Sequence, residues 1–413
     1  MLRQQRSTTF TYSLGRLLVS DDHLYLSAEE AAGILGVNLP TLYAYVSRKN
    51  IRSVKVEGSR KRRYWAADIE RLTKGNKRPG TAEQPMLGLG NQSSAITLLT
   101  DNGVYYRGVS ATELADAASV EEAAELIWQS SGAFSEALPT MPACTKTLLD
   151  LYSDMSVSEK AIALFPLVER ENPRAFDLSP DAYARTGADV VRILASLIAG
   201  RGAPSTQPLH EFMTSELKVD PAYKDLIRRL MVLFIDHEFD HCTYSVRAAA
   251  RTGVTPYYAA IAGLTTYQGR RTAYSRHQAA NRLLTEICVA KDPTPAILQY
   301  FSQSGEIPGF NHSTHKLEDP RVANLLTALT QLFESDQEFQ NLMKAVEVAN
   351  ELVRKPPEFV LLASFVGRKC NLVGQELALA GIARTIGWIA HASEQCQLPI
   401  SRQRANYVGK LPL

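Results

Sequence analysis

The chain has no run approaching about 18 consecutive apolar residues, and this excludes an ordinary transmembrane helix. Its first 18 residues, MLRQQRSTTFTYSLGRLL, contain no apolar segment ahead of a small-residue cleavage site, so we expect no secretory signal. Cysteine is scarce, and the five that occur show neither metal-ligand spacing nor a pairing pattern: Cys144, Cys242, Cys288, Cys370 and Cys396. This usage is typical of the reducing cytoplasm, so we expect a cytoplasmic protein without a metal site.

Strong compositional bias is also missing. The 413 residues are 45% hydrophobic and 21% charged, with 24 Gly and 20 Pro, and these values exclude collagen-like, low-complexity and disordered classes. At about 100–200 residues per domain, the length predicts two to four domains.

The formal net charge of +2 is unevenly distributed. Residues 1–80 contain 15 Lys and Arg against 7 Asp and Glu, a net charge of +8. The rest of the chain contains 30 basic and 36 acidic residues, a net charge of −6. A basic N-terminal part on an acidic body indicates that the N-terminal part alone meets a polyanion.

Residues 26–74 have the pattern of a compact module. We expect its first helix to begin after Ser27, because Glu30 follows three positions later in a capping-box signature, and to end at Gly36. The apolar positions of this helix are expected on one buried face: Leu26, Ala31, Ile34 and Leu35.

A second helix is expected after a short turn, because Asn38 can cap it and Pro40 suits a first turn. Two short helices around a tight turn are the pattern of a helix-turn-helix. Leu42, Tyr45 and Val46 are expected to face inward. The outer face is expected to carry Thr41, Tyr43, Ala44, Ser47, Arg48 and Lys49.

The next segment, IRSVKVEGSRKRRYW, has two short alternating runs around a central Gly, which predicts a β-hairpin wing; a last helix, AADIERLT, closes the module. Residues 48–63 contain eight basic residues and one acidic residue. After a helix-turn-helix, such a run favours phosphate binding. We therefore expect duplex DNA to be bound by Thr41, Tyr43, Ser47, Arg48, Lys49, Arg60, Lys61, Arg62 and Arg63. A protein–protein adaptor built on the same small fold is the alternative.

The Gly- and Pro-containing stretch 75–92 reads as a linker. From residue 93 the periodicity is mostly helical, and the main strand signal is SAITLLT, an Asp-Asn-Gly turn and VYYRG. The body is therefore expected to be mainly α.

Five segments of this body carry recognisable motifs, in this order: DNGVYYRGVSATELADAASVEEAAELIW, DHEFDHCTYSVRAAARTG, PGFNHSTHKLEDPR, GIARTIGWIAHASEQ and SRQRANYVG. Together they resemble the citrate synthase family over about residues 92–409. Residues 26–74 separately resemble the excisionase/MerR-type winged helix-turn-helix domain.

The resemblance implies a two-domain helical fold. Its large domain would comprise residues 93–272 and 374–413, and a small domain, residues 273–373, would close over the substrate. Ahead of these lie an N-terminal arm (1–25), the winged helix-turn-helix domain (26–74) and the linker (75–92). The family acts as a homodimer that condenses acetyl- or propionyl-CoA with oxaloacetate, without a metal or other cofactor.

The oxaloacetate half of the family's site is represented in full. Its histidines match His237 and His312, and its arginines match Arg321, Arg384 and Arg402, the last from the partner subunit of the implied dimer. Arginines supply a fork that fits a carboxylate. Arg384 stands in the apolar run LALAGIARTIGWIA, so it needs a buried anionic partner. Three other histidines near these motifs are expected to cap or pack: His241, His315 and His391.

The acyl-CoA half departs from the family pattern. Where the family has Gly-Pro-Leu-His-Gly-Gly-Ala, this chain has GRRTAYSRHQAAN. Counting from either side places Thr272 or Ala273 at the His position, whereas a five-residue insertion would place His277 there. Each alignment loses the two glycines that let the backbone approach the thioester.

The family's catalytic base is an Asp followed by Phe, and Glu358 is the candidate here, with one extra methylene. A misplacement of about 1 Å can lower a rate about 10²-fold. Loss of one oxyanion donor lowers it a further ~10²–10³-fold. His277, Thr272 or Tyr274 could substitute as donor, and Lys316 stands where the family often has a basic CoA-binding residue.

Two functions remain open on these residues. In the favoured one, the chain binds oxaloacetate- or citrate-type carboxylates, has weakened or lost condensing activity, and acts as a DNA-binding regulator that responds to the metabolite. In the other, it is an active citrate or 2-methylcitrate synthase with acyl-CoA as co-substrate. An inert scaffold would leave the complete set of arginines without a purpose.

Overall fold

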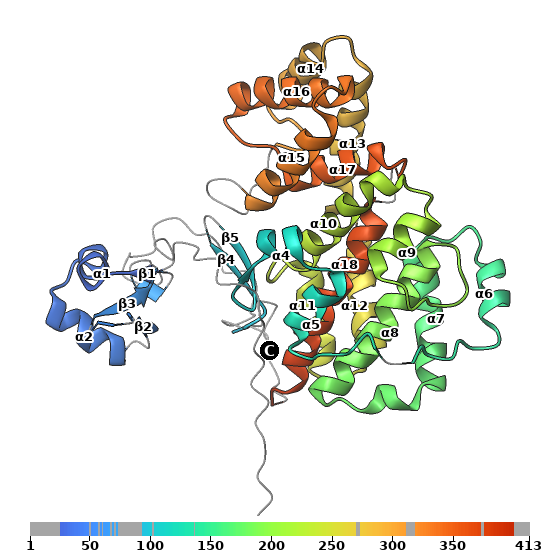
Figure 1. Ribbon diagram of the computed structural model, residues 1–413, viewed down its shortest axis with the longest axis horizontal. Helices are drawn as coiled ribbons and strands as arrows, with labels where there is room; N and C mark the ends of the chain where they lie inside the picture. The colour runs from blue at the N-terminus through green and yellow to red at the C-terminus, as the bar shows by residue number, and fades with distance from the viewer. Residues whose placement is uncertain are drawn as a thin grey trace, which may run out of the picture. The chain divides into compact units, whose positions relative to one another are not determined.

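The computed structural model describes residues 25–48, 51–56, 58–59, 61–66, 68–69, 72, 93–100, 103–135, 137–269, 273–310, 319–372 and 376–399. It divides into two compact units, residues 1–90 and 91–413 (Figure 1). All five cysteines are free thiols. No helix in the described ranges is long and apolar enough to cross a membrane.

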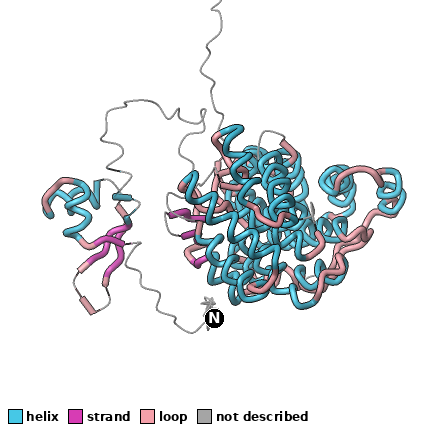
Figure 2. Tube along the Cα trace, turned by 90° about the horizontal axis from the view of Figure 1, so that it is seen from above, coloured by secondary structure: helices cyan, strands magenta, loops and turns pink. Residues whose placement is uncertain are grey.

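Among its described residues, the N-terminal unit contains two short helices and a three-stranded antiparallel sheet, and residues 66, 68–69 and 72 after the sheet are also helical (Figure 2). The helices are α1 (Ala28–Leu35) and α2 (Leu39–Arg48). The strands are β1 (Tyr25–Leu26), β2 (Ser53–Lys55) and β3 (Arg62–Trp65), in the order β1-β3-β2. The predicted helix pair and the β2–β3 hairpin are confirmed, and β1 is an additional strand beside β3.

Local hydrogen bonds explain where α1 and α2 begin. The Ser27 amide donates to the Glu30 carboxylate at 2.8 Å, and the Glu30 amide donates back to the Ser27 hydroxyl at 3.2 Å, so the predicted capping box is confirmed. Gly36 ends α1 with φ 65°, and Asn38 accepts the Thr41 amide at 2.9 Å.

The buried face of α1 differs from the prediction. Ala31 and Ala32 are buried, whereas Ile34 is 48% exposed. Ala28 and Leu35 pack beside those alanines, so the inward face of the helix turns past Ile34. Helix α1 contacts both α2 and β3, and small side chains at its buried positions allow such neighbours to approach closely.

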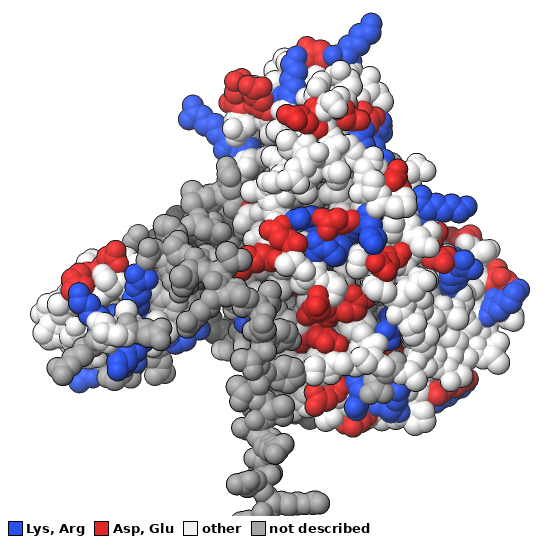
Figure 3. All heavy atoms as spheres, viewed as in Figure 1, with Lys and Arg blue, Asp and Glu red and all other residues white. Residues whose placement is uncertain are grey.

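The C-terminal unit opens with a second three-stranded sheet formed by β4 (Thr97–Thr100), β5 (Gly103–Tyr106) and β6 (Val109–Ser110). The strands are antiparallel in the order β4-β5-β6, and Thr97 is paired with Tyr106. This confirms the predicted hairpin. In the view of Figure 3 the N-terminal unit shows more basic than acidic surface, whereas both kinds are interspersed on the C-terminal unit.

The rest of the C-terminal unit is helical, which confirms the predicted mainly α fold. Its first helices are α4 (Ala111–Ala117), α5 (Val120–Trp128), α6 (Thr145–Leu151), α7 (Val157–Glu171), α8 (Pro180–Ile198), α9 (Leu209–Glu216), α10 (Lys224–Phe234), α11 (His241–Ala250) and α12 (Pro256–Tyr267). They are followed by α13 (Ala273–Val289), α14 (Thr294–Ser304), α15 (Pro320–Phe333), α16 (Gln337–Val353), α17 (Phe359–Lys369) and α18 (Glu376–Cys396). The described residues also include two 3₁₀ turns, Pro173–Phe176 and Pro221–Tyr223.

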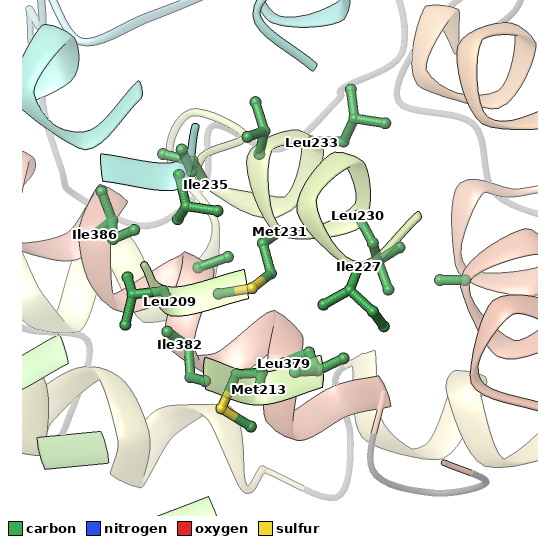
Figure 4. Packing of buried hydrophobic residues seen from close by; sticks show 14 of the residues in the cluster. Leu209, Met213, Ile227, Leu230, Met231, Leu233, Ile235, Leu379, Ile382 and Ile386 are labelled. Carbon is green, nitrogen blue, oxygen red and sulfur yellow. The ribbon is translucent and has the colours of Figure 1, made fainter. Parts of the chain in front are cut away.

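Helix α18 lies in the core of the bundle. It packs against α5, α8, α10, α11 and α12. Figure 4 shows its side chains Leu379, Ile382 and Ile386 among those of α10, including Met231. The helix therefore holds together elements that lie far apart in the sequence.

Helices α13 to α17 pack on one another and gather at one end of the C-terminal unit (Figure 1). α13 lies against α16 and α17, and α15 also contacts α10 and α4. Residues 91–413 form one compact unit, so the division into large and small domains at 273 and 373 stays a prediction.

Candidate functional site

The segment that follows α10 carries the first candidate residues. Asp236 is fully buried, and the Tyr106 hydroxyl lies 3.3 Å from its backbone oxygen. The next residue, His237, is half-buried. Glu238 has a φ of 59°, and its amide donates to the Asp236 carboxylate at 3.1 Å. The segment is therefore a tight turn built around a buried carboxylate.

Arg384, on α18, is the second candidate and fastens this turn. One terminal nitrogen of its guanidinium donates to Asp236 at 3.0 Å, and the other donates to Asp240 at 3.1 Å. Its side chain is 8% exposed. The prediction that a buried Arg384 has an anionic partner is confirmed, and both partners belong to its own chain.

Burial and pairing act in opposite directions on these groups. Burial alone would raise the pKa of the Asp236 carboxyl, but His391 and Arg384 hold that pKa well below its ordinary value. Burial alone would lower the pKa of Arg384, and the carboxylates of Asp240 and Asp236 raise it above its ordinary value. Both groups are therefore charged at neutral pH.

A buried polar chain continues from Asp236 to the start of the unit. His391 lies 3.2 Å from the Asp236 carboxylate and 3.3 Å from Arg247. A guanidinium only donates, so Nδ1 of His391 accepts from Arg247 and Nε2 donates to Asp236. Arg247 pairs with Glu394 at 2.6 Å, and Glu394 accepts the Ala95 amide at 2.7 Å. His391 thus packs within the core, in agreement with its predicted structural role.

Arg321, at the start of α15, is the third candidate. It is 8% exposed and holds the Asp319 carboxylate through Nε and Nη2, at 2.6 Å for the closest pair. Its guanidinium lies 4.6 Å from the centre of the Phe359 ring. Phe359 in turn meets Phe234 edge-on at 4.8 Å. Phe359, the first residue of α17, therefore contacts both α15 and the end of α10. The α10 residue that it meets, Phe234, precedes His237 by three positions.

Glu358, the candidate base, immediately precedes α17 and is half-buried. Its amide donates to the Gly309 carbonyl at 2.7 Å. Gly309 has a φ of +85°, and a Cβ there would press on the Leu361 side chain. Both the backbone conformation and the close approach of Gly309 to Leu361 therefore require a glycine. His237, Arg321, Glu358 and Arg384 thus lie on segments that contact one another directly or through Phe359.

The other candidates are placed less directly. His312, Lys316, Arg402 and Thr272 lie outside the described residues. Ala273 and Tyr274 open α13, where their side chains are not described. His277 is on α13 and 2% exposed, so protein covers its imidazole in this conformation. As a substitute donor it would need α13 to shift.

In the N-terminal unit, α2 and the β2–β3 hairpin carry the predicted DNA contacts. Tyr43 is 53% exposed, and Arg48 is also exposed. The Thr41 hydroxyl donates to Asn38 at 2.7 Å, so it takes part in capping α2. Lys61 and Arg62 are exposed, and Arg63 is half-buried. Lys49 and Arg60 lie outside the described residues, as does the side chain of Ser47.

Three groups that build this site were not among the residues predicted from the sequence. Asp236 and Asp240 were seen only as parts of a motif, yet they hold Arg384. Phe359 was seen only as the residue after the candidate base. Nothing in the local pattern marks these contacts, although an apolar helix that contains an Arg indicates that a carboxylate lies somewhere nearby.

Comparisons with protein families agree with this division of the chain. A family model described as "Citrate synthase, C-terminal domain" matches residues 85–404, and one described as "Helix-turn-helix domain" matches residues 25–77. The chain is 26% identical over 351 residues to a citrate synthase of Synechocystis sp. (strain ATCC 27184 / PCC 6803 / Kazusa), covering 75% of this chain and 86% of that protein. It is 21% identical over 366 residues to citrate synthase 2 of Bacillus subtilis (strain 168), covering 80% and 96%.

Solved structures give the same result for the fold. A citrate synthase from Thermotoga maritima MSB8 superposes with a TM-score of 0.63 at 19% identity, covering 81% of this chain and 97% of that one. A citrate synthase of Thermoplasma acidophilum, in a ternary complex with carboxymethyl coenzyme A and oxaloacetate, superposes with a TM-score of 0.61 at 18% identity, covering 79% and 95%. The predicted fold class is therefore confirmed.

Proposed function

We propose that this chain, which belongs to the citrate synthase family, is a DNA-binding regulator that responds to a carboxylate metabolite. One observation carries the proposal: a helix-turn-helix domain and a nearly full-length citrate synthase-like region are joined in one polypeptide. The first would bind duplex DNA. The second would bind oxaloacetate, citrate or a related carboxylate.

The carboxylate pocket would be assembled from the residues that match the family's oxaloacetate half. His237, Arg321 and Arg384 would bind the ligand, with His312 polarising its ketone. Arg402 would enter from the partner subunit of a homodimer. The contacts through Phe359 support this assembly, because they bring α10, α15 and α17 together around one point.

Condensing activity would be weakened or lost because of the segment that replaces the family's glycine loop. Residues 273–289 are helical, and His277 is covered. A thioester carbonyl needs a donor that is already aimed at the developing oxyanion. A helix without the two glycines is a poor substitute for a loop that approaches the thioester through its backbone.

The alternative is an active citrate or 2-methylcitrate synthase, and the placement of Glu358 favours it. Its backbone is tied to Gly309, close in sequence to His312, so a carboxylate is retained beside the proposed pocket. Glu358 would act as base and His277 as donor, with Lys316 near the CoA phosphates.

Three measurements on the same preparation separate these functions. Thiol release with oxaloacetate and acetyl- or propionyl-CoA reports condensation, calorimetric titration with oxaloacetate and citrate reports binding, and fluorescence anisotropy of a labelled duplex reports DNA binding. The regulator predicts carboxylate binding without turnover, together with a duplex affinity that changes when the carboxylate is added. Turnover with no effect of carboxylate on DNA binding would favour the enzyme.

A thermal-shift experiment tests the pocket itself. A ligand at about 100 times its Kd should add ~2.7 kcal/mol to the free energy of unfolding. Arg384→Ala should abolish the shift, whereas Arg201→Ala, at an exposed arginine paired with Glu216, should leave it intact. Circular dichroism of both variants checks that they are folded. Absence of a shift with every di- and tricarboxylate would contradict the pocket.

A further inference from the structure

Asp240 has two contacts in the candidate site. It is the N-cap of α11, and its Oδ1 accepts the Thr243 amide at 2.7 Å. Its Oδ2 accepts a hydrogen bond from Nη2 of Arg384 at 3.1 Å. The same carboxylate therefore caps a helix and pairs with Arg384, the arginine that is expected to bind the ligand.

Each of the two terminal nitrogens of the Arg384 guanidinium donates two hydrogen bonds within the protein. Nη1 donates to the Ile235 carbonyl at 3.3 Å and to Asp236 at 3.0 Å. Nη2 donates to Asp240 and to the Thr243 hydroxyl, both at 3.1 Å. These two nitrogens carry four N–H groups, and four acceptors face them. A ligand carboxylate can bind them only by displacing one of those acceptors.

Asp240 is the acceptor that can leave. The Asp236 side chain is fully buried and is also held by His391 and the Glu238 amide. The Asp240 side chain is 43% exposed. When the Asp240 carboxylate rotates away from Arg384 it enters water, which solvates its charge. Moving the Asp236 carboxylate would instead leave a buried charge uncompensated.

We propose that Asp240 is an internal competitor for the ligand carboxylate at Arg384 and thereby sets the ligand concentration at which the site responds. The inference rests on the proposed carboxylate-binding function. With Asp240 in place, Arg384 faces two carboxylates, so an incoming anion meets a group whose charge is already compensated. The apparent Kd equals the intrinsic Kd divided by the fraction of molecules in which Asp240 is displaced. A smaller fraction therefore gives a higher apparent Kd.

Asp240→Asn tests this with little disturbance of the helix, because Asn caps a helix as well as Asp does. If the displaced arrangement is populated to about 10%, removing the competing charge should lower the Kd for oxaloacetate or citrate about tenfold. The matched control is Asp220→Asn, another N-cap whose Oδ1 accepts a backbone amide, that of Ala222. Its Kd should equal that of the wild type.

The measurement is calorimetric titration of the full chain with oxaloacetate and citrate, with the ligand-free melting temperature recorded for each variant. Tighter binding by Asp240→Asn at an unchanged ligand-free melting temperature supports the proposal. Binding by Asp240→Asn alone, with none by the wild type, also supports it, but shows that the wild-type chain does not respond as proposed.

Two outcomes overturn the inference. If the wild type binds and Asp240→Asn binds equally or more weakly, Asp240 is not a competitor, and the proposed function is unaffected. If neither binds any di- or tricarboxylate, there is no ligand to compete with, and the proposed function fails with the inference.

Discussion

The guanidinium of Arg384 and the carboxylate of Asp189 are both buried, but they differ in how well their charges are compensated by neighbouring groups. Arg384 is matched by Asp236 and Asp240, so both signs of charge persist in the core. Asp189, on α8, is 2% exposed and is held by Asn172 and by one long contact to Arg174 at 3.3 Å. Burial raises the pKa of Asp189 to about 6, because these partners only partly offset the loss of water.

Stability should therefore depend on pH through Asp189. A carboxyl whose folded pKa lies above its unfolded value stabilises the fold below about pH 4, and this contribution is lost as the pH rises through about 6. A difference of about two pKa units corresponds to on the order of 3 kcal/mol. Asp189→Asn stays neutral, so its free energy of unfolding relative to the wild type should increase between pH 4 and pH 7.

Urea denaturation at several pH values measures this difference. Asp181→Asn, at an exposed residue in the first turn of the same helix, is the control and should show no comparable trend. A constant difference between Asp189→Asn and the wild type across the range would show that Asp189 is charged throughout.

Glu358 is the candidate base for condensation, and its carboxylate can be tested by substitution. If the chain condenses at all, Glu358→Gln should lower the rate of thiol release by ~10²–10⁴-fold, because the amide keeps the shape and loses the basicity. Glu358→Asp, with the shorter side chain of the family, is expected to raise it. An unchanged rate in the Gln variant would mean that another carboxylate is the base.

At the scale of elements, α18 controls how the turn around Asp236 is held. Gly387 lies against this turn, and a Cβ at that position would collide with the Ile235 carbonyl and come within 2.8 Å of Asp236. Gly381, on the same helix, has no described atom within 4 Å of its would-be Cβ. The two glycines thus differ in what their missing side chains permit.

Gly387→Ala should destabilise the fold by ~1–3 kcal/mol, because neither backbone can give way without moving Asp236. It should also weaken carboxylate binding. Gly381→Ala should instead be neutral or stabilising by ~0.5–1 kcal/mol, since alanine is the better helix former. Thermal denaturation and calorimetry of the pair check both effects, and equal stabilities would contradict the close packing of α18 on the turn.

At the scale of the whole molecule, the chain joins a basic unit to an acidic one. If the C-terminal unit dimerises, as proposed, two helix-turn-helix units are presented with two-fold symmetry. The preferred DNA site would then be an inverted repeat, with α2 in the major groove and the hairpin along phosphates.

Neutralising the exposed hairpin residues Lys61 and Arg62 as a double Gln variant should weaken binding to all duplexes alike. The slope of log affinity against log salt should flatten by ~0.9 for each lost phosphate contact. Tyr43→Ala should instead change the sequence preference, because its side chain is exposed on α2.

Anisotropy titrations at several salt concentrations measure both variants, with Lys146→Gln on the other unit as the control. A full chain that shows no salt-sensitive affinity for any duplex would make the N-terminal unit an adaptor.

The elements that could be predicted from the sequence are those with local causes. Ser27 and Glu30 meet within one turn of helix, and the hairpin strands alternate around a short turn, so pattern and capping chemistry suffice to predict them. Ordered motifs also placed the body in its fold class. Ile34 was assigned wrongly because periodicity marks an apolar stripe without saying which of its edges meets a neighbour.

The groups that hold the site together come from distant parts of the chain and follow from its packing. Arg384 lies 148 residues from Asp236 and 144 from Asp240 in the sequence. The amide of Glu358 likewise donates to the carbonyl of Gly309, which belongs to a different segment of the chain. Such contacts depend on which helices pack together, and α18 brings most of them into reach. A sequence can show that a buried arginine needs a carboxylate. Which carboxylate it receives, and whether a ligand can replace it, follows from the packing alone.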